Sequence, residues 1–242
     1  MIRLHSYESL GTYDGPGLRL VVFLQGCNFR CRYCANPDTI EPKGACREVT
    51  AEEIFEMAVS QKPFFGKRGG VTFSGGEPTL QARELLPLFR RLKEAGIHIC
   101  LDTNGSIHTP EVEELWLLTD LVLLDIKQFN PSAHLDLTGS QNLSTLATAA
   151  YLEAHEKPFW LRYVLVPGIS DREEDIRALG EAMGRYRMVE RVEILPYHTL
   201  GVHKWAAMGW EYTLGGVREN TPEQLDRARR LFEEYFEVVY VN

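Results

Sequence analysis

The chain has 242 residues, of which 44% are hydrophobic and 25% are charged, and its formal net charge is −8. This composition is that of an ordinary globular protein, and the negative charge argues against a nucleic-acid-binding protein. No apolar run reaches the roughly eighteen residues that a membrane span needs. The first residues show no signal-peptide pattern, so we expect a cytoplasmic protein with no membrane segment.

Apolar strand-like runs alternate with helical patterns along the whole chain. Strands are predicted over residues 18–24, 70–74, 98–103, 121–127, 159–166 and 191–196, with a last one at 238–241. Helices are predicted over 51–61, 79–95, 110–118, 144–155, 171–185 and 222–235. Thr50 is expected to cap the first helix and Gly96 to end the second. Because the strands are apolar on both faces, they favour a parallel sheet covered by helices. The pattern predicts an α/β fold, a partial (β/α)6 TIM-like barrel of parallel strands, as a single domain over residues 1–242.

The first predicted strand ends at Gly26 and leads into Cys27, Cys31 and Cys34, three of the five cysteines. Three thiolates are one ligand short of a closed tetrahedral zinc site. The odd cysteine count and the chain length argue against a disulfide framework. A four-iron cluster held by three cysteines leaves one iron open to a non-protein ligand. The spacing therefore favours a catalytic iron–sulfur cluster.

Polar residues follow the second and third predicted strands, at the edge where parallel sheets bind ligands. Gly75, Gly76 and Glu77 follow the second strand, and adjacent glycines let a backbone approach a ligand closely. Asp102 and Asn104 end the third strand and would share one face. Taken alone, each of these segments is typical of a plain turn.

The later strands also carry charged residues. Asp125 and Lys127 share a face at the end of the fourth strand, either as a simple ion pair or as a site for a zwitterionic amino acid. Arg162 lies inside the apolar fifth strand, where a charge is costly unless it is paired. We expect Arg162 to face ligand or substrate in the barrel interior, or else to pair with Asp125 or Asp102. His198 follows the sixth strand, as an ordinary polar residue or as a donor to a ligand.

The CxxxCxxC spacing, with Tyr33 before the third cysteine, resembles the signature of the radical S-adenosylmethionine (SAM) superfamily. The resemblance extends over nearly the whole chain to one family within it, the pyruvate formate-lyase activating enzymes. It rests on residues 5–19, 101–105, 124–128, 162–168, 195–198 and 203–209. The resemblance implies the radical SAM fold, a [4Fe–4S] cluster and SAM. It also implies that a 5′-deoxyadenosyl radical abstracts a hydrogen from a backbone glycine of a partner enzyme.

The same resemblance implies a role for individual residues. The cluster ligands would be Cys27, Cys31 and Cys34. The residues at SAM would be Tyr33, Cys34, Ala35, Gly75, Gly76, Glu77, Asp125, Ile126, Lys127 and His198. A monovalent cation, Na⁺ or K⁺, would lie at Asp102, Thr103 and Asp125. On the substrate side, Asp14 would touch the partner's glycine segment, and Arg162 is a further candidate.

The partners implied by the resemblance are the glycyl-radical enzyme pyruvate formate-lyase and a flavodoxin-type electron donor. Ala35 stands where a histidine is common in the family, and Pro78-Thr79 replace an Ala-Ile pair. These departures bear on adenine or substrate contacts and leave the cluster ligands in place. Residues 35–70 contain no cysteine except Cys46, so the ferredoxin-like insert of many other glycyl-radical activases is missing and one cluster is predicted.

Three alternatives stay open at this point. One is a radical SAM enzyme acting on a small molecule, such as a deazaguanine synthase, which the likeness beyond the cysteine loop disfavours. The second is a non-catalytic iron–sulfur electron carrier, which would normally close its cluster with four cysteines. The third is a structural zinc module, although Cys46 has no nearby partner and Cys100, in an apolar run, is typical of an ordinary buried side chain.

Overall fold

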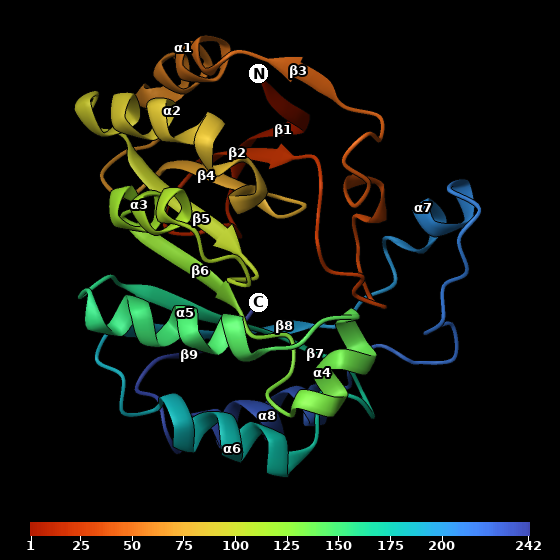
Figure 1. Ribbon diagram of the computed structural model, residues 1–242. Coiled ribbons are helices and arrows are strands. Elements are labelled where there is room, and N and C mark those ends of the chain that lie inside the picture. The colour runs from red at the N-terminus through yellow and green to blue at the C-terminus, as the bar shows by residue number, and fades with distance from the viewer. The chain divides into compact units, whose positions relative to one another are not determined.

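A computed structural model describes residues 1–242. They form two compact units. The first unit comprises Met1–Asn28, Thr39–Thr103 and Ile107–Leu123, and the second comprises Phe29–Asp38, Asn104–Ser106 and Leu124–Asn242. The elements of both units are labelled in Figure 1. A single domain over residues 1–242 stays a prediction. None of the helices combines the length and apolar character that crossing a membrane would require.

The first unit is built on a sheet with the strand order β3-β1-β2-β4-β5. Its parallel strands are β2 (Arg19–Leu24), β4 (Gly70–Gly75) and β5 (His98–Thr103). Two further strands pair antiparallel and were not predicted, β1 (Ile2–Gly11) and β3 (Arg47–Val49). Their polar, half-exposed side chains lack the apolar run by which the other strands were recognised.

The helices of the first unit stack side by side along the sheet (Figure 1). They are α1 (Ala51–Gln61), α2 (Ala82–Glu94) and α3 (Pro110–Leu118). Thr50 caps α1 through a capping box with Glu53, as predicted. The predicted helix over 79–95 is two elements, a 3-10 turn at Pro78–Gln81 followed by α2. Gly96 follows α2 with φ +65°, which confirms the predicted stop.

The second unit has a parallel sheet in the order β7-β8-β9. Its strands are β7 (Phe159–Leu165), β8 (Val189–Pro196) and β9 (Val239–Val241). Its helices are α4 (Pro131–Thr138), α5 (Leu143–Ala154), α6 (Glu173–Met183), α7 (Val202–Ala207) and α8 (Pro222–Glu233). β6 (Leu121–Asp125) crosses the boundary between the units and ends two residues before the predicted end at 127.

Two helices of the second unit, α4 and α7, were not predicted. The sequence does carry start and stop signals for α4. The Asn130 side chain accepts from two N–H groups of the first turn, and Pro131 occupies the first helical position. Gly139 ends the helix in the left-handed conformation with φ 72°. At six residues, α7 is too short to show a helical period.

A buried arginine ties the loop between β1 and β2 to the sheet of the first unit. The Arg19 side chain is 0% exposed, and its Nε donates to Thr72 Oγ1 at 2.5 Å. Its guanidinium also donates to the carbonyl of Pro16 at 2.9 Å. Thr72 Oγ1 in turn donates to the carbonyl of Asp14 at 2.6 Å. The backbone on both sides of Gly15 is therefore held by side chains of β2 and β4.

Gly15 lies where no other residue fits. Its φ of +118° is strained for residues with a side chain, and an added Cβ would lie 2.8 Å from Cys100 Sγ. Cys100 itself is 0% exposed, as predicted for an ordinary buried side chain. The segment around Asp14 is thus packed closely onto the core of the first unit.

We expect Thr72→Val to lower the free energy of unfolding by about 2 kcal/mol, because buried polar atoms of Arg19 and Asp14 each lose a partner. Chemical denaturation measures this change. Thr12→Val, at an exposed position of the same loop, should leave stability within error of wild type. Equal stability of the two variants would show that the Thr72 hydroxyl does not anchor the loop.

Candidate functional site

In the first unit, the turn after β4 is hydrogen-bonded to the start of the cysteine loop. β2 and β4 are parallel with Leu24 opposite Gly75, so their carboxyl ends lie at one edge of the sheet. The N–H of Gly76 donates to the Leu24 carbonyl at 2.9 Å, and the N–H of Glu77 donates to the Gly26 carbonyl at 2.7 Å. The chain entering the cysteine loop is thereby placed against the Gly-Gly-Glu turn.

The two glycines of this turn are needed for backbone packing within the protein. A Cβ on Gly75 would lie 2.4 Å from the Leu24 nitrogen, and one on Gly76 would lie 2.1 Å from the Gly26 carbonyl oxygen. The sequence analysis explained the glycines by close approach to a ligand. The structure adds a second reason, since any side chain here would separate the turn from the cysteine loop.

Glu77 is buried and directed into the protein. It is 1% exposed, and its Oε1 accepts from the N–H and the hydroxyl of Thr79, at 3.0 and 2.6 Å. The same oxygen accepts from Thr103 Oγ1 at 2.7 Å. Glu77 therefore joins the turn after β4 to the end of β5. A contact between Glu77 and SAM stays a prediction.

Asp102 lies beside Thr103 at the end of β5. Its Oδ2 accepts from Ser74 Oγ at 2.7 Å, which fixes the carboxylate at the carboxyl edge of the sheet. No group of three or more His, Cys, Asp or Glu side chains has the arrangement that holds a single metal ion. The monovalent cation at Asp102, Thr103 and Asp125 stays a prediction.

In the second unit, α4 holds the middle of the cysteine loop. The N–H of Arg30 donates to the carbonyl of Thr138 at 2.7 Å, and the N–H of Arg32 donates to that of Leu137 at 2.9 Å. These carbonyls belong to the last turn of α4, where a helix leaves acceptors without internal partners. The cysteine loop thus caps a helix that was not predicted from the sequence.

Tyr33 anchors the loop in the core of the second unit. Its side chain packs on a cluster of buried residues formed by Val166, Tyr197 and Leu214. Burial raises the pKa of the Tyr33 phenol well above its ordinary value. The predicted aromatic before the third cysteine therefore serves as a packing anchor in the protein.

The cysteines on either side of Tyr33 belong to one turn, since the N–H of Cys34 donates to the Cys31 carbonyl at 3.0 Å. None of the five cysteines is in a disulfide. Burial raises the pKa of the Cys34 thiol, so a metal cluster has to displace a proton from this sulfur on binding. Three thiols outside any disulfide, in a short loop, are soft donors that fit an iron–sulfur cluster.

Asp125 and Lys127 form an ion pair with a distance of 2.7 Å between Oδ2 and Nζ. Their side chains are 15% and 14% exposed, so the pair is largely removed from water. Desolvation acts to lower the pKa of Lys127, but the Asp125 carboxylate and other nearby groups outweigh it and raise that pKa well above its ordinary value. Lys127 stays cationic, and removing either partner leaves a buried charge uncompensated.

Arg162 lies on the face of β7 away from α8, because its neighbour Tyr163 packs edge-on against Phe232 of α8 at 5.5 Å between ring centroids. The Arg162 Nε lies 3.5 Å from Glu193 Oε2, and Glu193 is its register partner on β8. The sequence analysis expected Arg162 to face ligand or substrate, or else to pair with Asp125 or Asp102, and these expectations stay predictions. The structure supplies an acidic partner from the adjacent strand that sequence reasoning missed.

Two predicted SAM contacts lie at the ends of strands in the second unit. The N–H of Ile126 donates to the Arg162 carbonyl at 3.0 Å, which holds the backbone between Asp125 and Lys127. His198 follows β8, is exposed, and accepts weakly at Nδ1 from the N–H of Leu200 at 3.4 Å. The structure thus leaves the His198 ring accessible, and its contact with SAM stays a prediction.

The predicted site residues divide between the two units. The first unit holds Asp14, Cys27, Gly75, Gly76, Glu77, Asp102 and Thr103. The second unit holds Cys31, Tyr33, Cys34, Ala35, Asp125, Ile126, Lys127, Arg162 and His198. Within each unit, hydrogen bonds tie many of them to the ends of strands.

The chain is similar to known proteins over most of its length. The profile of the Radical SAM superfamily matches residues 21–179. The chain is 48% identical to the pyruvate formate-lyase-activating enzyme of Streptococcus mutans, over 96% of this chain and 93% of that protein. It is 47% identical to the pyruvate formate-lyase 1-activating enzyme of Escherichia coli K12, over 96% of each chain.

Among solved structures, SuiB of Streptococcus suis bound to S-adenosylmethionine superposes with a TM-score of 0.73 at 15% identity, covering 93% of this chain and 50% of that one. These matches confirm the predicted fold class, the partial (β/α)6 barrel of the radical SAM fold. A [4Fe–4S] cluster and SAM are the cofactors of this superfamily, and neither a zinc module nor a simple electron carrier fits it. The chain belongs to the radical SAM superfamily and, within it, to the family of pyruvate formate-lyase-activating enzymes.

Proposed function

We propose that this chain cleaves SAM reductively and abstracts a hydrogen from a backbone glycine of pyruvate formate-lyase, which leaves a glycyl radical on that enzyme. The observation that carries the proposal is the identity of 47–48% to proteins named for the activation of pyruvate formate-lyase, along nearly their full length. The reaction balances as one electron and one SAM entering, with methionine and 5′-deoxyadenosine leaving.

Cys27, Cys31 and Cys34 would hold the cluster. Because the first two are four positions apart, the backbone allows at most about 14 Å between their Cα atoms. Both ends of the loop are therefore able to serve one cluster. When bound, the cluster and SAM supply the electron and the 5′-deoxyadenosyl radical, while the protein supplies orientation and electrostatics.

Asp125 and Lys127 are suited to the methionine end of SAM, which carries an ammonium and a carboxylate. Lys127 offers a cation to the carboxylate and Asp125 offers an anion to the ammonium. Each charge is already compensated by the other at 2.7 Å, so neither side chain holds an unpaired charge in the protein. Gly76, through its backbone, and His198 would complete the contacts with SAM.

The remaining assignments are also proposals. Asp102, Thr103 and Asp125 would bind a monovalent cation beside SAM, since oxygen ligands suit hard cations. Asp14 would face the partner's glycine segment, from a loop that Arg19 and Thr72 hold in place. A flavodoxin-type protein would deliver the electron, and the cytoplasm would be the compartment.

Electron paramagnetic resonance tests the proposed reaction. Reduced protein, SAM and pyruvate formate-lyase should together give a glycine-centred doublet, with one 5′-deoxyadenosine formed for each radical. If 5′-deoxyadenosine forms without the doublet, and a small-molecule substrate is consumed instead, the protein is not the activase.

Cys34→Ala should abolish SAM cleavage, because the cluster loses one of three protein ligands. The measurements are iron and sulfide content after anaerobic reconstitution and 5′-deoxyadenosine by chromatography. Cys46→Ala is the matched control, since Cys46 is a free cysteine outside the loop, and it should keep full iron and full cleavage. Loss of the cluster in Cys46→Ala would contradict a site of three cysteines.

Asp14→Asn should leave SAM binding unchanged and lower the glycyl-radical yield on the partner about tenfold, the effect expected for losing one charge-assisted hydrogen bond. The isosteric amide keeps the shape of the loop. Glu48→Gln, at an exposed position of β3, is the control and should give the wild-type yield. A wild-type radical yield for Asp14→Asn would remove Asp14 from the partner interface.

A further inference from the structure

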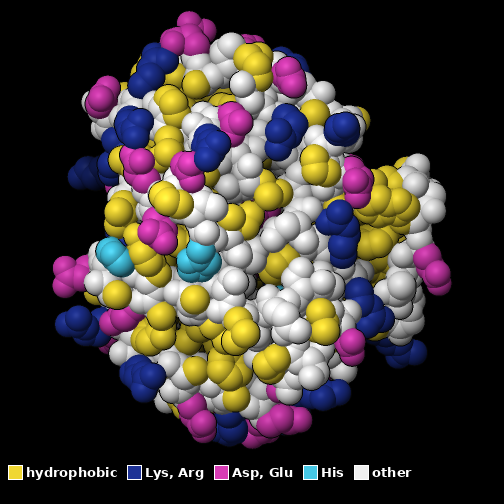
Figure 2. Space-filling model, viewed as in Figure 1, with side chains coloured by type: hydrophobic (Ala, Val, Ile, Leu, Met, Phe, Trp, Pro, Cys, Tyr) yellow, Lys and Arg dark blue, Asp and Glu magenta, His cyan; other side chains and the backbone are white.

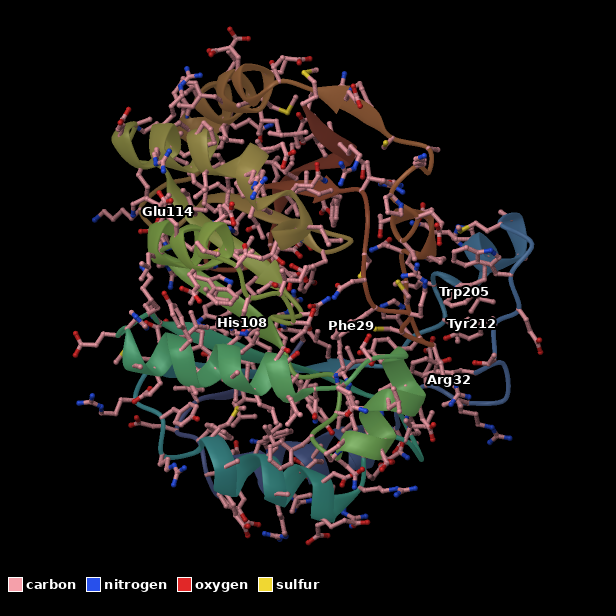
Figure 3. All side chains as sticks on the ribbon, in the orientation of Figure 1. Phe29, Arg32, His108, Glu114, Trp205 and Tyr212 are labelled. Carbon is pink, nitrogen blue, oxygen red and sulfur yellow. The ribbon has the colours of Figure 1, made fainter.

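The segment from Gly201 to Thr213, which contains α7, has no role in the assignments above. It lies in the second unit, as does the end of the cysteine loop. Figure 3 shows Trp205 and Tyr212 from this segment close to each other and beside the cysteine loop. Figure 2 shows hydrophobic side chains gathered over α7 and its surroundings. We call residues 201–213 the 201–213 segment.

The central contact is a hydrogen bond from an indole to the third cysteine of the loop. Trp205 Nε1 donates to the carbonyl oxygen of Cys34 at 2.9 Å, across 171 positions of sequence. This carbonyl belongs to the peptide that joins Cys34 to Ala35. Cys34 lies outside any helix or strand, so regular backbone pairing does not orient this peptide.

The residues that follow Cys34 are held by the same segment. Lys204 Nζ donates to Asn36 Oδ1 at 2.9 Å and lies 3.1 Å from an oxygen of Asp38. Gly201 packs against Ala35 so closely that an added Cβ would lie 2.5 Å from the Ala35 carbonyl oxygen. Three consecutive residues of the loop, from the third cysteine onward, are therefore in contact with the 201–213 segment.

The 201–213 segment is itself anchored. The Trp205 ring makes edge contacts with Trp210 and Tyr212, with ring centroids 6.0 and 5.5 Å apart. The hydroxyl of Tyr212 shares a hydrogen bond of 2.8 Å with that of Tyr197, which is buried after β8. The indole N–H is thus presented to Cys34 by a fixed aromatic group.

We propose that Trp205 is a positioning residue for SAM: its indole N–H holds the Cys34–Ala35 peptide in the orientation that SAM binding requires. A peptide whose carbonyl accepts this bond cannot rotate, and the Ala35 N–H on the other side of the same peptide plane is fixed with it. The resemblance to the family implies that SAM contacts the backbone of Cys34 and Ala35. The proposal rests on the SAM-cleaving half of the proposed function and is independent of the protein partner.

The test is SAM binding to anaerobically reconstituted protein, measured without any partner. Trp205→Phe keeps an aromatic ring and loses the N–H donor, and it should raise the Kd for SAM about five- to tenfold, as for one hydrogen bond. It should also change the SAM-induced paramagnetic resonance signal of the reduced cluster, while iron content and melting temperature stay at wild type. Trp210→Phe loses an indole N–H that does not contact the loop and should bind SAM like wild type.

Gly201→Ala disturbs the other peptide of Ala35, which joins it to Asn36. Its new methyl would press on Ala35 and should likewise weaken SAM binding, with unchanged circular dichroism. Wild-type Kd and wild-type cluster signal in Trp205→Phe, or equal weakening in Trp205→Phe and Trp210→Phe, would overturn the proposal. So would wild-type SAM binding in Gly201→Ala. Failure to activate pyruvate formate-lyase would bear on the proposed function and not on this inference.

Discussion

The peptide groups of the cysteine loop are held by hydrogen bonds from neighbouring parts of the protein, and the site depends on this constraint. The loop has almost no regular secondary structure, so its geometry has to be imposed from outside. In the first unit, the N–H groups of Gly26 and Cys27 donate to the carbonyls of Thr39 and Ile40. In the second unit, the end of α4 accepts from two loop amides, and Trp205 donates to Cys34. A ligand set on such a loop is preorganised without belonging to a helix or strand.

Buried polar side chains also fix the segments that surround the cysteine loop. Glu77 joins two strand ends, Arg19 holds the segment near Asp14, and Asp125 pairs with Lys127. Each would be costly to bury alone, and each has partners close by. Glu77 and the Asp125–Lys127 pair lie at the carboxyl ends of strands, whereas Arg19 lies at the amino end of β2.

Much of this fold could be read from the sequence, because buried parallel strands leave unbroken apolar runs such as Leu121–Leu124 of β6. β1 was not predicted, since its apolar alternation is limited to Ile2 and Leu4 and the rest of the strand is mostly polar. The chemistry of the site was visible where residue type is itself diagnostic, as for the cysteines. Contacts between distant segments were not visible. The sequence alone does not indicate that Trp205 contacts Cys34 or that Arg162 contacts Glu193. Those contacts are set by register and packing in the folded chain.

The sequence analysis and the structure explain the two glycines and Glu77 differently, because contacts between distant segments are not visible in the sequence. A Gly-Gly-Glu sequence suggests a ligand cradle, but the structure shows that backbone packing already demands Gly76 and that one Glu77 oxygen is committed to threonines. From the sequence, each of these residues was explained by a single role, namely contact with a ligand. In the folded protein, a residue beside a ligand also has to satisfy its own neighbours.

Because the cysteine loop caps α4, the conformation of the loop that would carry the metal centre affects the end of this helix. The amides of Arg30 and Arg32 fill acceptors at the last turn of α4, which Gly139 then terminates. If the loop loosens, those acceptors lose their donors and the helix frays from its carboxyl end. Disorder in the loop would then spread beyond the sulfur ligands to the residues near Gly139.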